Sequence, residues 1–511
     1  MSNYLDILAE TIRNNWDAPA LTDFYLMEDG KAQDTSRGNH YTYGEMYAEI
    51  VRVANLLTNL GMQKGDHIVI CGANSSHWVI AYLAIAQMQG VSVVIMPSLQ
   101  IDNIVQMVDF SDAKALFVGS ELCNEFKEKS LPKVKSVISL DDWSILYGEN
   151  QIINHKFEIL NGECGFPYSK PDNLAMICFT SGSTGGAKGV MLSNRSISNN
   201  SKDFHNLYPY DANKNYISLC PFAHLSGFMG DFISQLTFGK HVYIPQDIIS
   251  TNNIYTAFSI LRPYMYISVP HVLKGLIEKY GDNLFNEFKP YCRLFFVGGA
   301  ALEKDCEKSI VNSSIPLAIV YGQTETGASI AITPYQGHCH GSCGKIVEGM
   351  TCRIAPNGEI IVKGENVMLG YYKDPEATAA KIDKDGWLHT GDKGHLDEDG
   401  YLYVEGRLEQ DIIVLPNGEN IRPDNIEAFI NALPEVKESI VFARDGKLVA
   451  IVVSDQQSVV SNQQSVVSLR REILRTVNPQ LPLFSQLYDV EITDQPLQRT
   501  EKQTIKRYLY S

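Results

Sequence analysis

A run of glycine, hydroxyl and lysine residues is the segment of this sequence best suited to chemistry. It follows a β-type apolar run that ends at Phe179, and from Thr180 to Gly189 it contains only Thr, Ser, Gly, Ala and Lys. Glycine lets backbone N–H groups turn toward a ligand, and successive N–H groups of this kind bind anions. The segment is not a Walker A loop, because Ala187-Lys188-Gly189 lacks the required Gly-Lys-Ser/Thr ending. We therefore predict a phosphate-binding loop of another kind.

The same segment resembles the phosphate loop of the AMP-forming adenylate superfamily, which includes acyl-CoA synthetases, peptide-synthetase adenylation domains and luciferases. That family usually has proline where this chain has Ala187. Because proline mainly stiffens a loop, we expect the difference to be tolerated. The resemblance implies that the chain binds ATP. The loop residues expected to bind its phosphates are Thr180, Ser181, Gly182, Ser183, Thr184, Gly185 and Lys188.

Two further segments resemble motifs that surround the nucleotide in this family. In Tyr321-Gly-Gln-Thr-Glu325, the resemblance implies that the aromatic ring stacks on adenine, that Thr324 contacts the α-phosphate and that Glu325 binds Mg²⁺. Mg²⁺ takes one or two carboxylates together with substrate phosphate oxygens, and Thr184 is the second candidate metal ligand. Residues 298–302 resemble the turn beside the adenine and the acyl carboxylate. The cofactor-binding candidates here are Gly298, Gly299, Ala300, Tyr321 and Gly322.

Three downstream segments follow in the order expected for the family. Gly386-Trp-Leu-His-Thr-Gly-Asp392 resembles a block in which Asp392 accepts hydrogen bonds from both ribose hydroxyls, and an ionised carboxylate is an acceptor-only group. Arg407 is expected to hold phosphate and ribose oxygens. Residues 417–427 resemble the long-chain acyl-CoA synthetase version of the next block. The resemblance extends over about residues 43–509, and ordered blocks are more specific than any single one.

The family places a lysine near the C-terminus, where it bridges the attacking carboxylate and the α-phosphate. When Thr500-Glu-Lys-Gln-Thr-Ile-Lys-Arg507 is compared with that pattern without gaps, Thr504 takes the lysine position. Lys502 and Lys506 lie two residues to either side. Three interpretations remain open: Lys502 takes the role, Lys506 takes it, or the chain adenylates slowly. We rank Lys502 first.

The acyl pocket is expected at residues 222–230 and 297–301. Amino-acid-activating relatives usually carry an aspartate just after the phenylalanine that matches Phe222, whereas this chain has Ala223. Burying an unpaired ammonium there would be costly, so an apolar, fatty-acid-like acid is favoured over an α-amino acid. The alternative is that 222–230 forms a helix packed into the core. The catalytic candidates are Lys502, Thr324, Glu325 and His224.

The elements that must position these residues change in type along the chain. Strand-like and helix-like runs alternate over 67–120 and again over 216–320, which predicts parallel sheets with helices on their faces. From about 340 to 406 the pattern becomes short strands with turn signals. The fold class is therefore α/β, with a β-rich part at 340–406. We predict an N-terminal body over 1–406 and a small, mobile α+β domain over 407–511.

Composition limits the classes of partner. The chain has 511 residues, with 43 Lys and Arg against 59 Asp and Glu, so its formal net charge is −16. Such a chain repels polyphosphate backbones at long range, which argues against nucleic-acid binding. The N-terminus lacks the features of a signal peptide. The densest apolar stretches, 78–88 and 91–97, are shorter than the roughly 20 residues of a membrane span, so we expect a cytoplasmic protein.

A short run of histidines and cysteines offers the ligand types of a metal site. It contains His338, Cys339, His340 and Cys343. Adjacent side chains in so short a stretch rarely all converge, and no second cysteine pair follows. We therefore expect an ordinary loop at this position.

The resemblance implies a ligase that uses ATP, Mg²⁺ and CoA. A carboxylate attacks ATP, pyrophosphate leaves, and a thiol converts the bound acyl-AMP into a thioester. Family members rotate the C-terminal domain between the two steps, and Glu409 occupies the hinge position; an ordinary solvated turn is the alternative for this residue. Two other functions remain open: a stand-alone ligase that loads a separate phosphopantetheine carrier protein, and a catalytically weak nucleotide-binding relative, which Thr504 favours.

Overall fold

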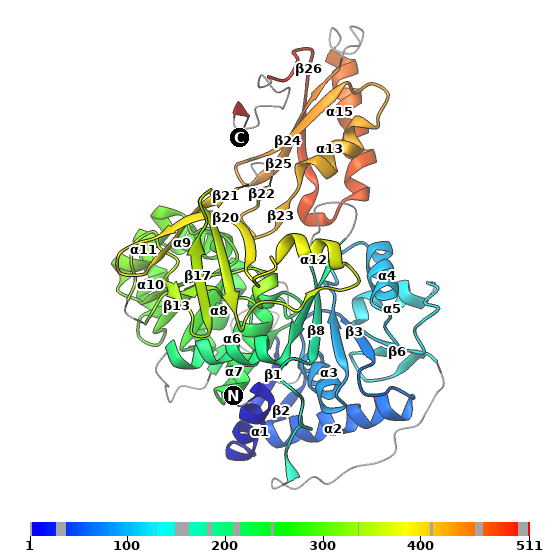
Figure 1. The fold of residues 1–511 in the computed structure, drawn as a ribbon, viewed down its shortest axis with the longest axis vertical. Coiled ribbons are helices and arrows are strands. Elements are labelled where there is room, and N and C mark those ends of the chain that lie inside the picture. Colours follow the sequence, from blue (N-terminus) through cyan, green and yellow to red (C-terminus); the bar gives the residue numbers. More distant parts are fainter. Residues whose placement is uncertain are drawn as a thin grey trace. The chain divides into compact units, whose positions relative to one another are not determined.

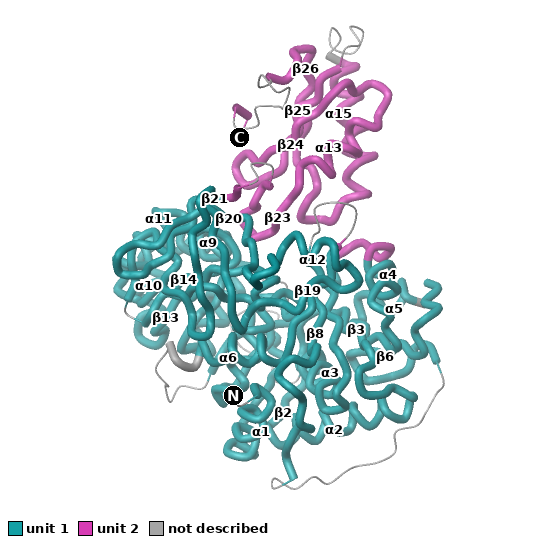
Figure 2. Tube along the Cα trace, viewed as in Figure 1, with its two compact units in different colours: residues 1–97, 104–180, 188–406 teal, residues 98–103, 181–187, 407–511 magenta. Residues whose placement is uncertain are grey.

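The chain divides into two compact units in a computed structural model (Figure 2). Unit 1 comprises residues 1–97, 104–180 and 188–406, and unit 2 comprises residues 98–103, 181–187 and 407–511. The structure describes residues 3–26, 37–127, 129–148, 163–180, 187–207, 215–246, 250–335, 337–408, 412–454, 463–498 and 509–510.

An eight-stranded sheet in unit 1 contains β8 and β9, the two strands that lie on either side of the predicted phosphate loop in the sequence (Figure 1). Its strand order is β19-β9-β8-β4-β3-β5-β6-β7. The strands from β8 to β6 run parallel, whereas β9 and β19 at one edge and β7 at the other are antiparallel to their neighbours. The strands are β3 (His67–Cys71), β4 (Val91–Val94), β5 (Ala115–Val118), β6 (Ser136–Ser139), β7 (Ile145–Tyr147), β8 (Leu174–Thr180), β9 (Lys188–Ser193) and β19 (Gly370–Tyr371).

Helix α2 (Tyr43–Asn59) shows how the sequence forms the elements that cover this sheet. At its N-terminus, Thr42 Oγ1 accepts a hydrogen bond from the Glu45 N–H and the Glu45 carboxylate accepts one from the Thr42 N–H, which is a capping box. Its helically spaced apolar residues are buried, and the chain turns at Gly61, whose φ of 79° suits glycine. The neighbouring helices are α3 (Ser76–Gln87), α4 (Ile101–Phe110) and α5 (Ser120–Lys127).

A second α/β layer of unit 1 supports the predicted adenine and magnesium motifs. Its sheet has the order β12-β13-β14-β15-β16, with the first three strands parallel and the last two antiparallel. The strands are β12 (Met265–Ser268), β13 (Leu294–Val297), β14 (Leu317–Tyr321), β15 (Ala331–Ile332) and β16 (Lys345–Ile346), and the helices are α8 (Thr251–Leu261), α9 (Pro270–Tyr280), α10 (Asp282–Phe288) and α11 (Lys304–Ser313).

Two four-stranded sheets complete unit 1. Among the described helices of the chain, none is long and apolar enough to cross a membrane. The first has the order β10-β11-β1-β2 and the second β17-β18-β20-β21. Their strands and the remaining helices are β1 (Pro19–Phe24), β2 (His40–Thr42), β10 (Asn215–Ile217), β11 (His241–Pro245), β17 (Met350–Ile354), β18 (Glu359–Gly364), β20 (Leu388–Leu396), β21 (Leu402–Arg407), α1 (Tyr4–Asn14), α6 (Asn194–Leu207), α7 (Ser234–Thr237) and α12 (Pro375–Lys381).

Aromatic side chains fill the core around a π-helix at Gly227–Ile233. The ring of Tyr82 lies 4.8 Å from that of Phe228 and 5.5 Å from that of Phe232, measured between centroids. The apolar side chains of the predicted acyl-pocket stretch lie in this core, where Phe222, Phe228 and Met229 are each 0% exposed. This packing matches the alternative interpretation, in which residues 222–230 form a helix packed into the core.

Unit 2 is an α+β layer. In its three-stranded sheet, β24 and β25 are antiparallel, and β25 and β26 are parallel. One core cluster joins the sheet to its two helices, with Ile426, Ile430 and Ile473 among its most buried members. The elements are β22 (Ile413–Val414), β23 (Asn420–Ile421), α13 (Pro423–Asn431), β24 (Glu438–Arg444), β25 (Lys447–Val453), α15 (Gln463–Val477) and β26 (Leu487–Thr493).

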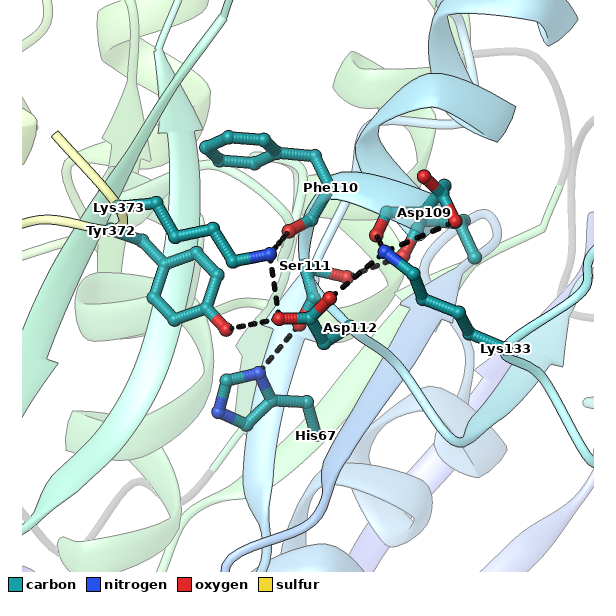
Figure 3. A network of polar contacts seen from close by, with 9 residues as sticks. His67, Asp109, Phe110, Ser111, Asp112, Lys133, Tyr372 and Lys373 are labelled. Carbon is teal, nitrogen blue, oxygen red and sulfur yellow. Dashed lines mark hydrogen bonds and ion pairs between the residues drawn. The ribbon is translucent and has the colours of Figure 1, made fainter.

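The carboxylate of Asp112 connects segments of unit 1 that lie far apart in sequence, since Tyr372 follows it by 260 residues (Figure 3). Asp112 Oδ2 lies 2.6 Å from Lys373 Nζ and accepts a hydrogen bond from Tyr372 Oη at 2.9 Å, while Oδ1 lies 2.9 Å from Lys133 Nζ. The hydrogen bond from Lys373, followed by that from Lys133, holds the pKa of the Asp112 carboxyl well below its usual range. The network fixes the two residues that directly follow β19.

We predict that Asp112→Asn destabilises unit 1 in a pH-dependent way. The pKa of Asp112 is lower in the folded chain than in the unfolded chain. The network therefore stabilises the folded state fully above the ordinary aspartate pKa of about 3.9, and this stabilisation is lost as the pH falls below that value. We expect a loss of about 1 kcal/mol or less at neutral pH, since solvent screens pairs that are more than one-third exposed. The difference from wild type should shrink toward pH 3.

The measurement is the urea midpoint from tryptophan fluorescence, because all four tryptophans lie within unit 1. Asp109→Asn is the matched control: Asp109 pairs with Lys133 at 3.3 Å, but no ion pair with Lys373 is recorded for it among the described residues. A difference between wild type and Asp112→Asn that stays constant with pH would contradict the proposed role of the ionised carboxylate.

Candidate functional site

The β8–β9 hairpin brings together the two ends of the predicted phosphate loop. Thr180, the last residue of β8, pairs with Lys188, the first residue of β9. Both side chains are half-buried. The other loop candidates lie outside the described residues, so their phosphate contacts and the metal role of Thr184 stay predictions; they are Ser181, Gly182, Ser183, Thr184 and Gly185.

Tyr371 connects the predicted phosphate-binding lysine with the predicted metal ligand. The ammonium nitrogen of Lys188 lies 5.0 Å from the centroid of the Tyr371 ring, within the range of a cation–π contact. Tyr371 Oη donates a hydrogen bond of 2.7 Å to Glu325 Oε1. Burial, and after it the charge of Glu325, raise the pKa of Tyr371. The phenol therefore stays protonated and serves as a donor to the carboxylate.

Tyr371 belongs to none of the motifs recognised in the sequence. Its position depends on the pairing of β19 with β9, in which Tyr371 lies opposite Val190. The Thr378 hydroxyl accepts a hydrogen bond from the Tyr371 N–H at 2.8 Å, and the Met368 N–H donates to the Glu325 carbonyl at 2.9 Å. A strand of two residues has no hydrophobic periodicity, so no sequence pattern could have indicated this contact.

A second tyrosine holds the carboxylate predicted to bind ribose. Tyr321 Oη, at the end of β14, donates a hydrogen bond of 2.6 Å to Asp392 Oδ2 on β20. Asp392 is only 6% exposed, and the Thr390 hydroxyl accepts a hydrogen bond from its backbone N–H at 3.0 Å. The candidates for adenine and ribose recognition, 71 residues apart in sequence, therefore lie in direct contact.

Two of the predicted glycines are required by close backbone packing. A Cβ at Gly322 would lie 1.9 Å from the Ala328 carbonyl oxygen, and one at Gly298 would lie 2.3 Å from Val320 Cγ1. Gly299 instead has a φ of 86°, which side chains rarely adopt. Gly298 lets the turn after β13 pass close to Val320 of β14, and Gly322 lets the chain after β14 pass close to Ala328. Ala300, the residue after Gly299, is half-buried.

Thr324 and Glu325 lie in a 3₁₀ turn at Thr324–Thr326, directly after β14. The Glu325 side chain is half-buried, and no described residue donates a hydrogen bond to its second oxygen, Oε2. A partly solvated carboxylate oxygen suits Mg²⁺, which retains water and phosphate ligands besides one or two carboxylates. The residues present therefore fit the predicted metal.

His224 lies apart from these contacts. Its ring is exposed, and its Nδ1 lies 2.7 Å from the Ser226 hydroxyl. The protein around it nevertheless withdraws the imidazole from water enough to lower its pKa, which favours the neutral ring. No hydrogen bond connects His224 with the other candidates in the described part of the chain, and its catalytic role stays a prediction.

The remaining candidates belong to unit 2 or lie outside the described residues. Arg407 is the last residue of β21 and is half-buried. Lys502, Thr504, Lys506 and the hinge candidate Glu409 lie outside the described residues. Their roles stay predictions.

Two family models together match most of the chain. The family described as AMP-binding enzyme matches residues 8–372, and the AMP-binding enzyme C-terminal domain matches residues 410–510. A 2-succinylbenzoate–CoA ligase of Oceanobacillus iheyensis is 29% identical over 426 residues, which cover 81% of this chain and 83% of that protein. A 4-coumarate–CoA ligase of Oryza sativa is 25% identical over 455 residues, which cover 82% and 78%.

A solved structure shares the fold across the whole chain. An o-succinylbenzoate CoA synthetase from Bacillus subtilis, bound with a product analogue, matches with a TM-score of 0.79 at 22% identity, covering 99% of this chain and 98% of that one. The α/β fold of the adenylate-forming enzymes is therefore confirmed. So is the predicted class, the AMP-forming acid–thiol ligases, whose members use ATP, Mg²⁺ and CoA. With most of its length matched, the chain belongs to the AMP-binding enzyme family.

Proposed function

We propose that the protein activates an apolar carboxylic acid with ATP, releases pyrophosphate, and transfers the acyl group from acyl-AMP to CoA. The observation that carries this proposal is the pair of tyrosine–carboxylate contacts, Tyr371–Glu325 and Tyr321–Asp392. The first orients a candidate Mg²⁺ ligand near the end of the phosphate loop, and the second orients a candidate ribose acceptor beside an aromatic ring. Both arrangements suit a nucleoside triphosphate.

In the first step, the acid attacks the α-phosphorus and pyrophosphate departs on the opposite side. No protein nucleophile is required, so catalysis depends on positioning and on stabilising the charge that builds on phosphate oxygens. The 180–189 loop holds the β- and γ-phosphates and Thr324 orients the α-phosphate. Glu325 would hold Mg²⁺, which would neutralise phosphate charge when bound. Lys502 is proposed to bridge the acid and the α-phosphate.

In the second step, the CoA thiol attacks the acyl carbonyl and AMP leaves. The bound acyl-AMP must be kept from water until then. We propose that residues 407–511 move as a domain between the steps, with Glu409 as the hinge and Arg407 holding phosphate and ribose oxygens. A hinge at the end of an element, just after β21, suits such a motion.

Residues close to the predicted acyl segment support an apolar acid rather than an α-amino acid. Asp231 is fully buried, but its carboxylate accepts hydrogen bonds from Tyr216 Oη at 2.6 Å and from the Leu219 and Cys220 N–H groups at 2.8 and 2.7 Å. The Asp231 carboxylate is thus occupied by hydrogen bonds within the protein, and Ala223 has no charge that could pair with the ammonium of an amino acid. The two CoA ligases compared above are named for acids that carry an aromatic ring, so ring-bearing and fatty acids both belong in the first assay.

The decisive measurement is ATP–pyrophosphate exchange across a panel of ring-bearing, fatty and amino acids, followed by mass spectrometry of thioesters. We expect exchange with apolar acids and formation of an acyl-CoA. Acyl transfer to a phosphopantetheine carrier protein but not to CoA would overturn the thiol assignment. Background exchange together with ATP or AMP binding in calorimetry would instead establish a nucleotide-binding relative.

We predict that Tyr371→Phe lowers kcat/KM for ATP by about tenfold or more, since hydrogen bonds to charged groups contribute about 1.5–3 kcal/mol. Loss of the hydroxyl leaves Glu325 without its donor. Tyr372→Phe is the matched control, because the hydroxyl of this neighbour bonds Asp112 instead. Pyrophosphate exchange should drop in the first variant and stay near wild type in the second; equal rates would refute the positioning role.

We predict that Lys502→Ala slows adenylation strongly, because it removes the proposed bridging ammonium, and that Lys506→Ala has a small effect. The measurement is single-turnover formation of acyl-AMP, followed by thioester formation from supplied acyl-AMP. The second reaction serves as a folding control. If Lys506→Ala forms acyl-AMP slowly and Lys502→Ala forms it at the normal rate, Lys506 is the bridging residue. Normal rates in both variants would exclude both lysines from that role.

A further inference from the structure

Three side chains outside the proposed nucleotide site converge on one point of unit 1. They are Glu307 on helix α11 and two histidines, His338 and His340, from the loop between β15 and β16. One ligand atom from each lies within 4.8 Å of the others. The sequence alone could not reveal this group, because Glu307 precedes His338 by about 30 residues and belongs to a different element.

Within this group, the contact between His338 and Glu307 is close but lacks the geometry of an ordinary hydrogen bond. His338 Nε2 lies 2.9 Å from Glu307 Oε1, and His340 Nδ1 lies 3.0 Å from Glu307 Oε2. Despite this proximity, neither ring nitrogen of His338 has a hydrogen-bond partner among the residues that the structure describes, although both nitrogens are buried. Two ligands of one tetrahedral ion with bonds near 2.0–2.1 Å are about 3.3 Å apart and point at the ion rather than at each other. The 2.9 Å contact between His338 and Glu307 is somewhat shorter than this separation, but it likewise lacks the alignment of a hydrogen bond.

Burial adds an electrostatic argument. The Glu307 side chain is 3% exposed and that of His338 17%, whereas that of His340 is 58% exposed. The Gly341 N–H donates to Glu307 Oε1 at 2.9 Å, but a buried carboxylate also requires a compensating charge. A divalent cation would supply that charge and would give one ring nitrogen of His338, Nε2, a partner. The exposed side at His340 leaves room for water as a further ligand.

We propose that Glu307, His338 and His340 form a binding site for Zn²⁺. Two imidazole nitrogens and one carboxylate oxygen are a ligand set typical of zinc with an open fourth position. Imidazole ligands also separate this site from that of Mg²⁺, which prefers oxygen ligands only. The ion fastens the loop between β15 and β16 to α11. Because β15 pairs with the end of β14 at Tyr321, the ion also stiffens the β14–β15 pair that holds this residue.

The cysteines of the same loop take other roles. Cys339 Sγ lies 3.1 Å from the Tyr403 hydroxyl, and Cys343 packs against the core of the second α/β layer. Neither belongs to the convergent group. Of the two histidines and two cysteines in this loop, only the histidines belong to the group, and its third member is the Glu307 carboxylate on α11.

The test is calorimetric titration of the full chain with ZnCl₂ after chelator treatment and desalting. We expect one equivalent to bind, with affinity reduced at least tenfold in Glu307→Gln and His338→Ala and unchanged in Cys339→Ser, the control from the same loop. Co²⁺ should give the visible absorption of a four-coordinate site without thiolate charge transfer, and Zn²⁺ should raise the Tm of the wild type.

Each outcome decides the proposal. Failure of the wild-type chain to bind Zn²⁺, or binding unchanged by the Glu307 and His338 substitutions, would establish an ordinary glutamate–histidine pair. If those variants fail to fold, His340→Ala provides the same test, since its exposed ring leaves the core intact. Loss of the Zn²⁺-dependent Tm shift in that variant supports the site, and retention of the shift overturns it. None of these readouts depends on the proposed ligase activity.

Discussion

The hydrogen bond from Tyr371 to Glu325 joins three distant parts of unit 1 into one candidate site. The tyrosine comes from β19, the carboxylate from the turn after β14, and the Tyr371 ring faces the ammonium of Lys188 on β9. The donor to Glu325 is a protonated phenol rather than a cation, so the carboxylate is oriented without being neutralised. The Tyr321–Asp392 contact follows the same principle.

This arrangement bears on how an acidic protein holds an anionic ligand. With a net charge of −16, the chain provides little long-range attraction for a nucleotide. Capture must be local, through backbone N–H groups, hydroxyls, a bound metal and a few cations. Lys188 is one such cation, and its contact with the Tyr371 ring helps to define where its charge lies. Each positioned donor therefore matters more here than it would in a basic protein.

Much of the fold could be predicted because buried parallel strands and amphipathic helices leave long, regular patterns. Helix α2 (Tyr43–Asn59), for example, buries apolar side chains at helical spacing along one face. The site blocks could be recognised because glycine, hydroxyl and carboxylate residues occur there in a fixed order. The contacts that position these blocks could not be predicted, since β19 has two residues and pairs with a strand almost 180 positions earlier. Residues 222–230 show the converse: apolar character alone does not distinguish a pocket wall from the core.

The position of β19 in the sheet also has a consequence for biosynthesis. On the ribosome, β9 is complete when Ser193 emerges, but its edge partner at Gly370 follows 177 residues later. At about 5–20 residues per second, this delay is roughly 9–35 s. During that time β9 is an unprotected edge strand, the kind of surface that pairs with other chains. Glu325 also waits for Tyr371, so the nascent chain completes its sheet edge and its candidate metal ligand in the same event.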